Sequence, residues 1–456
     1  MISSKKKFHF IGIGGSGMSG VAQICLAQGH SVSGSDLRQS LATTRLQDKG
    51  AVISFPHSHS NIKEDPVVVI SSAIPESNEE LSFARQQGLP IMKRAEVLGD
   101  FMQGREGIAV AGCHGKTSTT SLVSNVLTVA GMDPTTVVGG EASHVGGNAK
   151  FGQGKYLVAE ADESDGSFLH LPSKYSIITN IDNDHLDYYG TFENILQHFM
   201  KFANQTEKKV VLCGEDCHLS LMAERLGDKA VTYGIGLGYN FSACDLRADS
   251  DGTRLSVFKD GEFYSELHLP IPGRHVVLNS LAALALCDSI GVATTDIVKG
   301  LQTFQGVQRR FEKVAQINGV DIYDDYAHHP SEVQATLQAA RQLMSSKKGK
   351  LVVCFQPHRY SRLRHLMKEF ADSFGEADFL YLMPVYAAGE VPISGVDHWK
   401  LYGNLSINSD KVSLLETNDI KQCREQILGE MRSGDILLTM GAGDITRLGR
   451  EIASDE

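Results

Sequence analysis

The sequence is poor in residues and patterns that would place it outside the ordinary globular proteins. It has one Trp, 12 Pro and eight Cys among 456 residues. The Cys are scattered, and only Cys213 and Cys217 lie close together, with no second pair to complete a zinc site. We therefore expect eight reduced thiols, as in a protein of the cytosol.

Long apolar runs are also missing, so no segment is expected to span a membrane. The basic start and the apolar residues 8–11 superficially resemble a signal peptide, but His9 and the glycines from Gly12 onward interrupt it. Basic residues are in deficit, with 43 Lys and Arg against 54 Asp and Glu. This balance argues against a nucleic-acid partner. We expect a cytoplasmic protein with no membrane and no nucleic acid as partner.

Short apolar runs alternate with amphipathic stretches throughout the chain, which is typical of β-α-β units and parallel sheets. A chain of this length is expected to form two or three domains. We place boundaries in the polar stretch 99–107 and in the segment 304–311. The prediction is an α/β fold with domains at 1–103, 104–308 and 309–456, the central one with a small antiparallel excursion over 241–270. The main predicted strands are 8–13, 30–33, 67–72, 107–111, 156–159, 176–180, 320–323, 350–355, 379–383 and 435–439, and the main helices 18–28, 82–87, 117–130 and 279–289.

The first motif is a G-x-G-x-x-G loop that follows a predicted strand and opens a helix. Its residues are Gly12, Ile13, Gly14, Gly15, Ser16 and Gly17. Such glycines let backbone N–H groups approach a pyrophosphate, and Asp36 closes the next strand at the spacing of a ribose-binding acid. By itself the loop suggests NAD, although a UDP-sugar satisfies the same geometry and a structural turn is the plainer alternative.

The second motif is a shortened phosphate-binding loop after the predicted strand 107–111. Its residues are Gly112, Cys113, His114, Gly115, Lys116, Thr117 and Ser118, and Val110 stands where the longer motif has its outer Gly. Backbone N–H groups would still hold phosphates, Lys116 would reach the β- and γ-oxygens of ATP, and Thr117 would ligate Mg²⁺. Two anion-binding loops in one chain predict two nucleotides.

Acidic clusters follow two further predicted strands. Residues 160–165 hold four carboxylates, and residues 180–187 contain three more together with His185. A solvated loop is the common fate of such runs, and a lone His is usually structural. The ends of parallel strands beside a phosphate loop are, however, where Mg²⁺ carboxylates lie, so a metal site is predicted here.

The last third of the chain carries paired basic residues at two predicted strand ends. Arg359 and Arg362 are three residues apart, so a helical turn would place them on one face, suited to gripping a substrate carboxylate. Arg309 and Arg310 at the second boundary would suit a phosphate. The segment 273–275 before Asn279 is either a simple helix cap or part of a nucleotide site.

Together these motifs resemble the Mur ligases of bacterial cell-wall synthesis. The resemblance rests on Gly-Gly-Ser-Gly-Met at 14–18, Gly-Lys-Thr at 115–117, Glu-Ala-Asp-Glu-Ser-Asp at 160–165, Asp-His-Leu-Asp at 184–187, Asp-Asp-Tyr-Ala-His-His-Pro at 324–330 and His-Arg-Tyr-Ser-Arg at 358–362. It implies a Rossmann-like N-terminal domain, a central ATPase and a Rossmann-like C-terminal domain. The implied reaction uses ATP and Mg²⁺ to join L-alanine to UDP-N-acetylmuramate, in a monomer or weak homodimer.

The resemblance also implies roles for single residues. Lys116 would hold the transferred phosphoryl group, and Arg310 would contact phosphates. Mg²⁺ would be bound by Thr117, Glu160 and His185. The adenine of ATP would contact Asn279, its ribose Asp325, and L-alanine His328, Arg359 and Arg362. The UDP group would be bound by Gly14, Gly15, Ser16, Gly17, Asp36, His57 and Ser72.

Two residues depart from the family pattern. Cys113 replaces a hydroxyl residue, which would make ATP binding sensitive to thiol oxidation. Val276 replaces an Asn that often follows Gly-x-His. Three alternatives stay open: a sister ligase that recycles muramoyl tripeptide, an NAD-dependent oxidoreductase built on the first loop, and a nucleotide-binding protein without chemistry.

Overall fold

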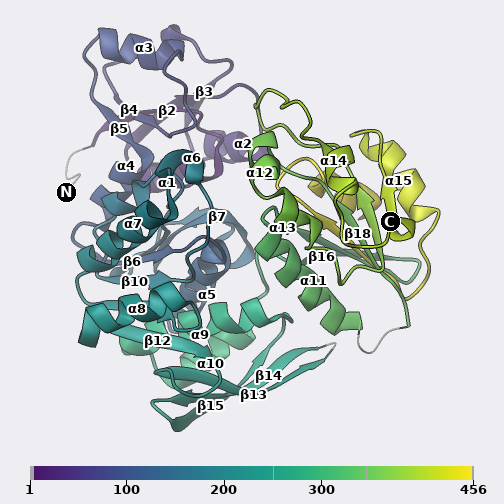
Figure 1. The fold of residues 1–456 in the computed structure, drawn as a ribbon. Helices are drawn as coiled ribbons and strands as arrows, with labels where there is room; N and C mark the ends of the chain where they lie inside the picture. Colours follow the sequence, from purple (N-terminus) through teal and green to yellow (C-terminus); the bar gives the residue numbers. More distant parts are fainter. Residues whose placement is uncertain (1–4, 250, 345–347, 454–456) are drawn as a thin grey trace. The chain divides into compact units, whose positions relative to one another are not determined.

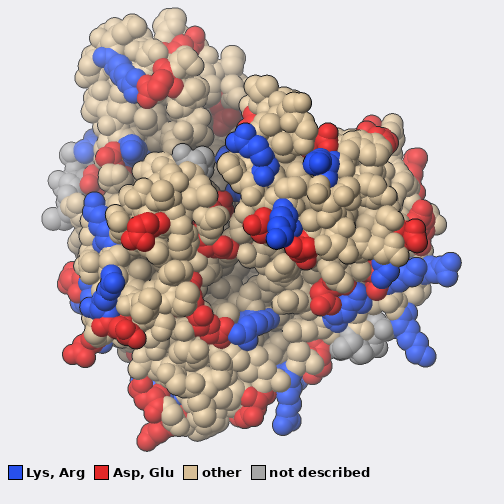
Figure 2. All heavy atoms as spheres, viewed as in Figure 1, with Lys and Arg blue, Asp and Glu red and all other residues tan. Residues whose placement is uncertain are grey.

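The computed structural model describes residues 5–249, 251–344 and 348–453 (Figure 1). The chain divides into two compact units. Unit 1 comprises 1–244, 256–267 and 278–305, and unit 2 comprises 245–255, 268–277 and 306–456. Within the described residues, no helix is long and apolar enough to cross a bilayer. Basic and acidic side chains are interspersed over the face drawn in Figure 2.

The N-terminal sheet is five-stranded and entirely parallel, in the order β3-β2-β1-β4-β5. Its strands are β1 (Lys7–Ile11), β2 (Ser31–Ser35), β3 (Val52–Ser54), β4 (Val67–Ile70) and β5 (Ile91–Lys93), with helices α1 (Ser16–Ala27), α2 (Leu41–Asp48), α3 (Glu79–Gln86) and α4 (Arg94–Met102). The parallel sheet and its glycine loop after β1 confirm the Rossmann-like prediction.

The central sheet has ten strands in the order β15-β14-β13-β12-β11-β10-β6-β9-β7-β8. The run from β7 to β13 is parallel, and β8 pairs antiparallel with β7. Only Asp260 and Gly261 join β14 to β15, a connection short enough only for an antiparallel pair, as predicted. The strands are β6 (Glu106–Ala111), β7 (Thr135–Ala142), β8 (Gly147–Lys150), β9 (Tyr156–Glu160), β10 (Tyr175–Ile178), β11 (Lys209–Cys213), β12 (Ala230–Ile235), β13 (Phe241–Asp249), β14 (Gly252–Lys259) and β15 (Glu262–Leu269).

Helices of the central region follow its strands. They are α5 (Lys116–Val129), α6 (Leu186–Tyr189), α7 (Phe192–Gln205), α8 (Cys217–Leu226), α9 (Arg274–Ser289) and α10 (Thr294–Gln302). Helix α9 begins at Arg274, five residues before the predicted start, so the segment 273–275 is a helix beginning. Helix α4 likewise runs through Gly99, which the sequence suggested was an interruption. Gly99 is needed for close approach, because a Cβ there would lie 2.5 Å from the His170 carbonyl oxygen.

The C-terminal sheet has six strands in the order β16-β17-β21-β18-β19-β20, all parallel except the β16–β17 hairpin. Its strands are β16 (Glu312–Ile317), β17 (Val320–Asp325), β18 (Leu351–Phe355), β19 (Phe379–Leu382), β20 (Val412–Leu414) and β21 (Ile436–Met440), with helices α11 (Pro330–Met344), α12 (Tyr360–His365), α13 (Met367–Ala371), α14 (His398–Tyr402), α15 (Ile420–Leu428) and α16 (Thr446–Ala453). One buried cluster contains residues of α11 and α13, and a second contains residues of α15 and α16. The helices therefore form two layers around the sheet.

Candidate active site

The phosphate loop, residues 112–118, connects buried strand β6 to helix α5 in unit 1. Gly112 has φ 129° and Gly115 φ 80°, values that favour glycine. A Cβ at Gly115 would also lie 2.6 Å from Asn279 Oδ1, so Asn279 of α9 lies beside the loop. Gly115 caps α5 without a side-chain hydrogen bond, which leaves the helix N-terminus suited to an anion.

Lys116 lies folded over this loop and is bound to its backbone. Its Nζ donates to the carbonyl oxygens of Gly112 at 2.7 Å and Cys113 at 3.1 Å. It also pairs with Glu163 Oε1 at 2.9 Å. Burial alone would lower the pKa of Lys116, but the charges of Glu163, Glu160 and Asp162 outweigh it and raise that pKa. Lys116 is therefore a fixed cation on the predicted phosphate loop.

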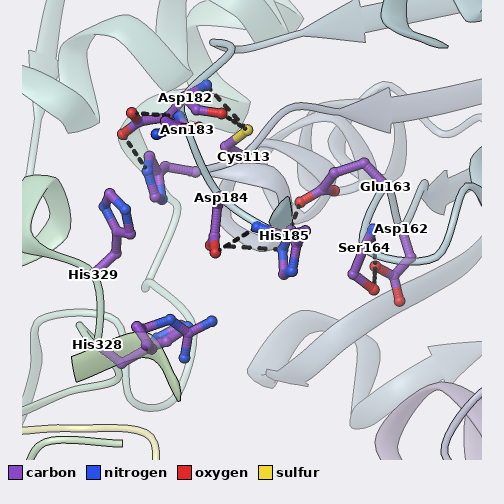
Figure 3. Close-up of polar contacts among 12 residues, drawn as sticks. Cys113, Asp162, Glu163, Ser164, Asp182, Asn183, Asp184, His185, His328 and His329 are labelled. Carbon is purple, nitrogen blue, oxygen red and sulfur yellow. Dashed lines mark hydrogen bonds and ion pairs between the residues drawn. The ribbon is translucent and has the colours of Figure 1, made fainter. Parts of the chain in front are cut away.

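Glu163 is a site residue that our sequence analysis did not single out. It is 1% exposed, pairs with Lys116, and has Oε1 3.5 Å from His185 Nε2 (Figure 3). Its Oε2 is buried and no described group hydrogen-bonds to it. The acidic run 160–165 indicated the region, but the sequence cannot tell which of its four carboxylates turns inward.

Glu160 and His185, the two predicted metal ligands after strand ends, both lie in unit 1 near Lys116. Glu160 Oε2 accepts from the Gly139 N–H at 2.7 Å, and the Glu160 charge acts on Lys116. His185 precedes α6 at φ 57° and lies 3.6 Å from Asp184 Oδ2 (Figure 3). Burial opposes a charge on His185, but the Glu163 hydrogen bond and the Asp184 charge raise its pKa.

The donor set around Lys116 fits Mg²⁺. It offers carboxylate oxygens of Glu160 and Glu163 and the hydroxyl of Thr117 in the first turn of α5, and Mg²⁺ prefers oxygen ligands. The unpartnered Glu163 Oε2 is consistent with this fit, because Lys116 pairs with the other oxygen, Oε1, and a buried carboxylate oxygen without a partner is costly.

Cys113 is buried and bound to the backbone of the neighbouring strand end. Its Sγ accepts from the Asp182 N–H at 3.1 Å (Figure 3). Burial, followed by the charge of Glu163, raises the pKa of Cys113 well above its usual value. Burial and the raised pKa both disfavour the reactive thiolate and so argue against the expected sensitivity to oxidation, which stays a prediction. The adjacent His114 donates its N–H to Asn180 Oδ1 at 2.9 Å, which fixes the loop.

The first glycine loop is held at the end of β1 by the neighbouring strand. Gly12 and Ile13 donate their N–H groups to the Ser35 carbonyl, and Gly14 donates to Asp36 Oδ2 at 2.8 Å. In this structure Asp36 therefore holds the glycine loop through Gly14, and its predicted contact with a ribose stays a prediction. A Cβ at Gly17 would lie 2.5 Å from Arg94 Nη1, so Arg94 covers the loop's last glycine.

A cavity of about 150 Å³ opens beside this loop, between α1 and the β7–β8 hairpin of the same unit. Gly14, Ser16 and Asn148 line it, and Arg45 pairs with Glu141 at 2.6 Å on its wall. Of the other predicted UDP contacts, Gly15 caps α1 and Ser72 is exposed after β4. His57 follows β3, and its Nδ1 lies 2.7 Å from Ser35 Oγ.

The remaining predicted residues lie in unit 2, around the ends of β17 and β18. Asp325 is buried, and its two oxygens accept the N–H groups of Phe311 and Ala327, both at 2.7 Å. Burial raises the pKa of Asp325 to about 6. In this structure Asp325 therefore holds the loop segments that contain Phe311 and Ala327. Its contact with the ribose stays a prediction. Arg310 lies over the Tyr326 ring, 5.1 Å from its centre.

His328 and Arg362 lie near His358 in the same unit. The His328 and His358 rings are 6.0 Å apart, and Arg362 Nη1 lies 3.4 Å from His358 Nδ1. Burial lowers the pKa of His328 to about 4, so its ring is neutral at pH 7. Arg359 is exposed and precedes α12 at φ 69°, so the expectation that one helical turn presents both arginines is wrong.

Fold and site define a class: a phosphoryl-transfer enzyme with a phosphate loop, a second nucleotide-type loop and a mostly parallel third sheet. Three family models match, described as the Mur ligase family catalytic domain over residues 7–106, the Mur ligase middle domain over 110–287, and the Mur ligase glutamate ligase domain over 309–443. The chain belongs to the Mur ligase family.

Individual relatives match over nearly the whole chain. The UDP-N-acetylmuramate–L-alanine ligase of Pelotomaculum thermopropionicum is 44% identical over 99% of this chain and 98% of its own. The crystal structure of the UDP-N-acetylmuramate–alanine ligase of Thermotoga maritima is 33% identical, with a TM-score of 0.84 over 99% of both chains. A murein peptide ligase of Psychrobacter arcticus, 22% identical with a TM-score of 0.71 over 98% of both chains, shares the fold. Family membership rules out the NAD-dependent oxidoreductase and the protein without chemistry.

Proposed function

We propose that this chain is an ATP-dependent ligase that joins L-alanine to the carboxylate of UDP-N-acetylmuramate in peptidoglycan precursor synthesis. The full-length relatives of that name, 41–44% identical, support this substrate pair. The single structural observation that supports it most is the ion pair between Lys116 of the phosphate loop and the buried Glu163. It acts in the cytoplasm as a monomer or weak homodimer, and sedimentation of the purified chain tests the oligomeric state.

The substrate carboxylate needs activation, because an amine that attacked it directly would have to expel oxide, which is a very poor leaving group. The substrate carboxylate attacks the γ-phosphorus of ATP, ADP leaves, and an acyl phosphate forms. Lys116 stabilises the negative charge that develops on the transferring group. Thr117, Glu160, Glu163 and His185 would hold Mg²⁺, which supplies further neutralisation of the phosphate charge when bound.

The alanine amine then attacks the acyl carbon, and phosphate leaves. His328 is a candidate to accept the amine proton, because its ring is neutral and its Nδ1 already bonds the Tyr326 carbonyl at 2.9 Å. That bond leaves Nε2 as the proton acceptor. Arg359 and Arg362 would hold the alanine carboxylate. Asn279, Arg310 and Asp325 would contact the adenine, phosphates and ribose of ATP.

One assay tests the substrate assignment. ADP release is measured with UDP-N-acetylmuramate alone and with L-alanine, glycine, L-serine or L-alanyl-γ-D-glutamyl-meso-diaminopimelate. We expect ADP formation that needs both the UDP-linked acid and L-alanine. Preference for the tripeptide would instead identify the recycling ligase, and release independent of an amino acid would contradict both.

Replacing Arg362 with Lys should raise KM for L-alanine about 10-fold or more, because a point charge cannot replace the bidentate fork of guanidinium. The ten-fold figure corresponds to one lost interaction of about 1.4 kcal/mol. KM for UDP-N-acetylmuramate should stay within about 3-fold, because the variant alters only the proposed alanine contact. The matched control is Arg364→Lys, an exposed arginine of the same short helix. Equal effects of the two variants, measured by initial rates, would remove Arg362 from the alanine site.

A further inference from the structure

A fully buried carboxylate, Glu80 of α3, lies under the edge of the N-terminal sheet where strands β2 and β3 end. Its Oε1 accepts from Ser58 N at 2.9 Å and Asn61 Nδ2 at 2.8 Å. Its Oε2 lies 2.5 Å from Ser35 Oγ and 3.3 Å from His9 Nε2. Burial alone would raise the pKa of Glu80, but the hydrogen bonds from His9, Ser35, Ser58 and Asn61 outweigh it and lower the pKa to about 2. Glu80 is therefore a permanent acceptor.

The ionised carboxylate fixes the direction of the next hydrogen bond. Ser35 has one hydroxyl proton, and with Glu80 Oε2 at 2.5 Å that proton must point to the carboxylate. Ser35 Oγ can then only accept from the other side, where His57 Nδ1 lies at 2.7 Å. His57 must therefore carry its proton on Nδ1. When the ring is neutral, its Nε2 is an acceptor.

The strand order places His57 where a nucleotide base would lie. Pyrophosphate binds at a glycine loop after β1, and the ribose lies near the acid that closes β2, here Asp36. The next strand outward is β3, which pairs with β2, and His57 follows it at the same edge. The His57 side chain is 15% exposed, and no hydrogen bond to its Nε2 is formed by the described residues. Its free nitrogen is therefore open to a ligand.

We propose that Glu80 is a positioning residue which, through Ser35, holds His57 in the tautomer that accepts a hydrogen bond from the N3–H of uracil. The relay selects uracil, because cytosine has no N3–H and presents an acceptor there. This inference rests on the proposed function for its ligand, since the UDP-linked acid supplies the uracil. The relay itself is a property of the protein and can be measured without substrate.

Substitution of Glu80 with Gln tests the relay through binding. The amide oxygen would face the donors Ser58 and Asn61, so the amide NH₂ would face Ser35 and donate to it. Ser35 would then give its proton to His57 Nδ1, and His57 Nε2 would carry a proton that repels the uracil N3–H. We expect affinity for UDP to fall about 10-fold, the usual effect of one mispaired buried polar group, and the preference for UDP over CDP to disappear.

The binding readout is calorimetry with UDP and CDP, and the kinetic readout is a rise in KM for UDP-N-acetylmuramate with kcat unchanged. Glu79→Gln is the matched control, because Glu79 is adjacent on α3 and, among the described residues, its side chain bonds only the exposed His59 N–H, at 3.0 Å. Ser35→Ala removes the relay without altering a charge and should also abolish the base preference. An undiminished preference for UDP in both variants would overturn the proposal, as would wild-type protein that binds the two nucleotides equally.

Nitrogen NMR of protein labelled with ¹⁵N-histidine observes the tautomer directly. His57→Gln identifies the His57 signals by their loss. We expect a protonated Nδ1 and an unprotonated Nε2 in the free wild type, and the reverse in Glu80→Gln. A protonated Nε2 in the wild type contradicts the relay. A correct tautomer in a protein that does not turn over UDP-N-acetylmuramate would reject the proposed function while leaving the relay intact.

Discussion

Replacing Lys116 with Ala should abolish ADP release, with a fall in kcat of at least about 10³-fold, the scale of losing a principal charge stabiliser of a phosphoryl transition state. Lys116 Nζ is held by two loop carbonyls and by Glu163, so its charge is fixed at the phosphate loop, and Ala leaves no ammonium there. The loss is one of transition-state stabilisation and should lower kcat more than it raises KM for ATP.

The fold should survive this substitution. Glu163 would lose its partner, but a buried carboxyl without a cation takes up a proton rather than remaining charged. Circular dichroism and thermal melting check the fold, and a coupled assay measures ADP. The control is Lys201→Ala, an exposed lysine of α7 in the same unit. Turnover near the wild-type rate in a folded Lys116→Ala protein would refute the assignment of the phosphate loop.

The sequence was sufficient for those parts of the fold that depend on local patterns. The glycine loop after β1 and the phosphate loop after β6 each need glycine at positive φ or in close contact. Gly12, Gly112 and Gly115 have such φ values, so the glycine pattern of the sequence indicated both loops. Buried parallel strands such as β18 are continuous apolar runs in the sequence, so they were also predictable. The strands that were not predicted are β3, β5, β7, β8, β11, β12, β16 and β20. Most of them are short or mixed with polar residues, but β11 is a buried apolar run that the pattern could have shown.

The candidate site was predictable by region but not by side chain. Glu163 and Glu160 belong to one acidic run, and only the folded loop shows that Glu163 turns toward Lys116 while Glu160 bonds the Gly139 N–H. Asp325 was expected at a ligand, yet both its oxygens bond backbone from two loops. Arg359 was expected in a helix that instead begins after it. Each of these outcomes depends on tertiary partners that no local spacing encodes.

Replacing Glu160 with Gln should lower kcat about 10²-fold or more and raise the Mg²⁺ concentration needed for half-maximal rate, because the amide keeps the shape but loses the charge. The amide oxygen can still accept from Gly139, so the position of β7 should not change. The reason is the local charge balance: Glu160 and Glu163 both act on Lys116, and the amide removes one of these two negative charges from the place where a divalent cation would bind.

Two measurements and one control variant make this prediction specific to the metal. Initial rates across a Mg²⁺ titration should show the shifted requirement, and Mn²⁺ binding with a non-hydrolysable ATP analogue should weaken in parallel. Glu193→Gln on the exposed face of α7 changes the net charge equally and should leave both unchanged. Because Glu160 stands at the end of β9 and its charge acts on Lys116, loss of rate without loss of Mn²⁺ affinity would mean that Glu160 acts through Lys116, and would leave Glu163 and Thr117 as the metal ligands.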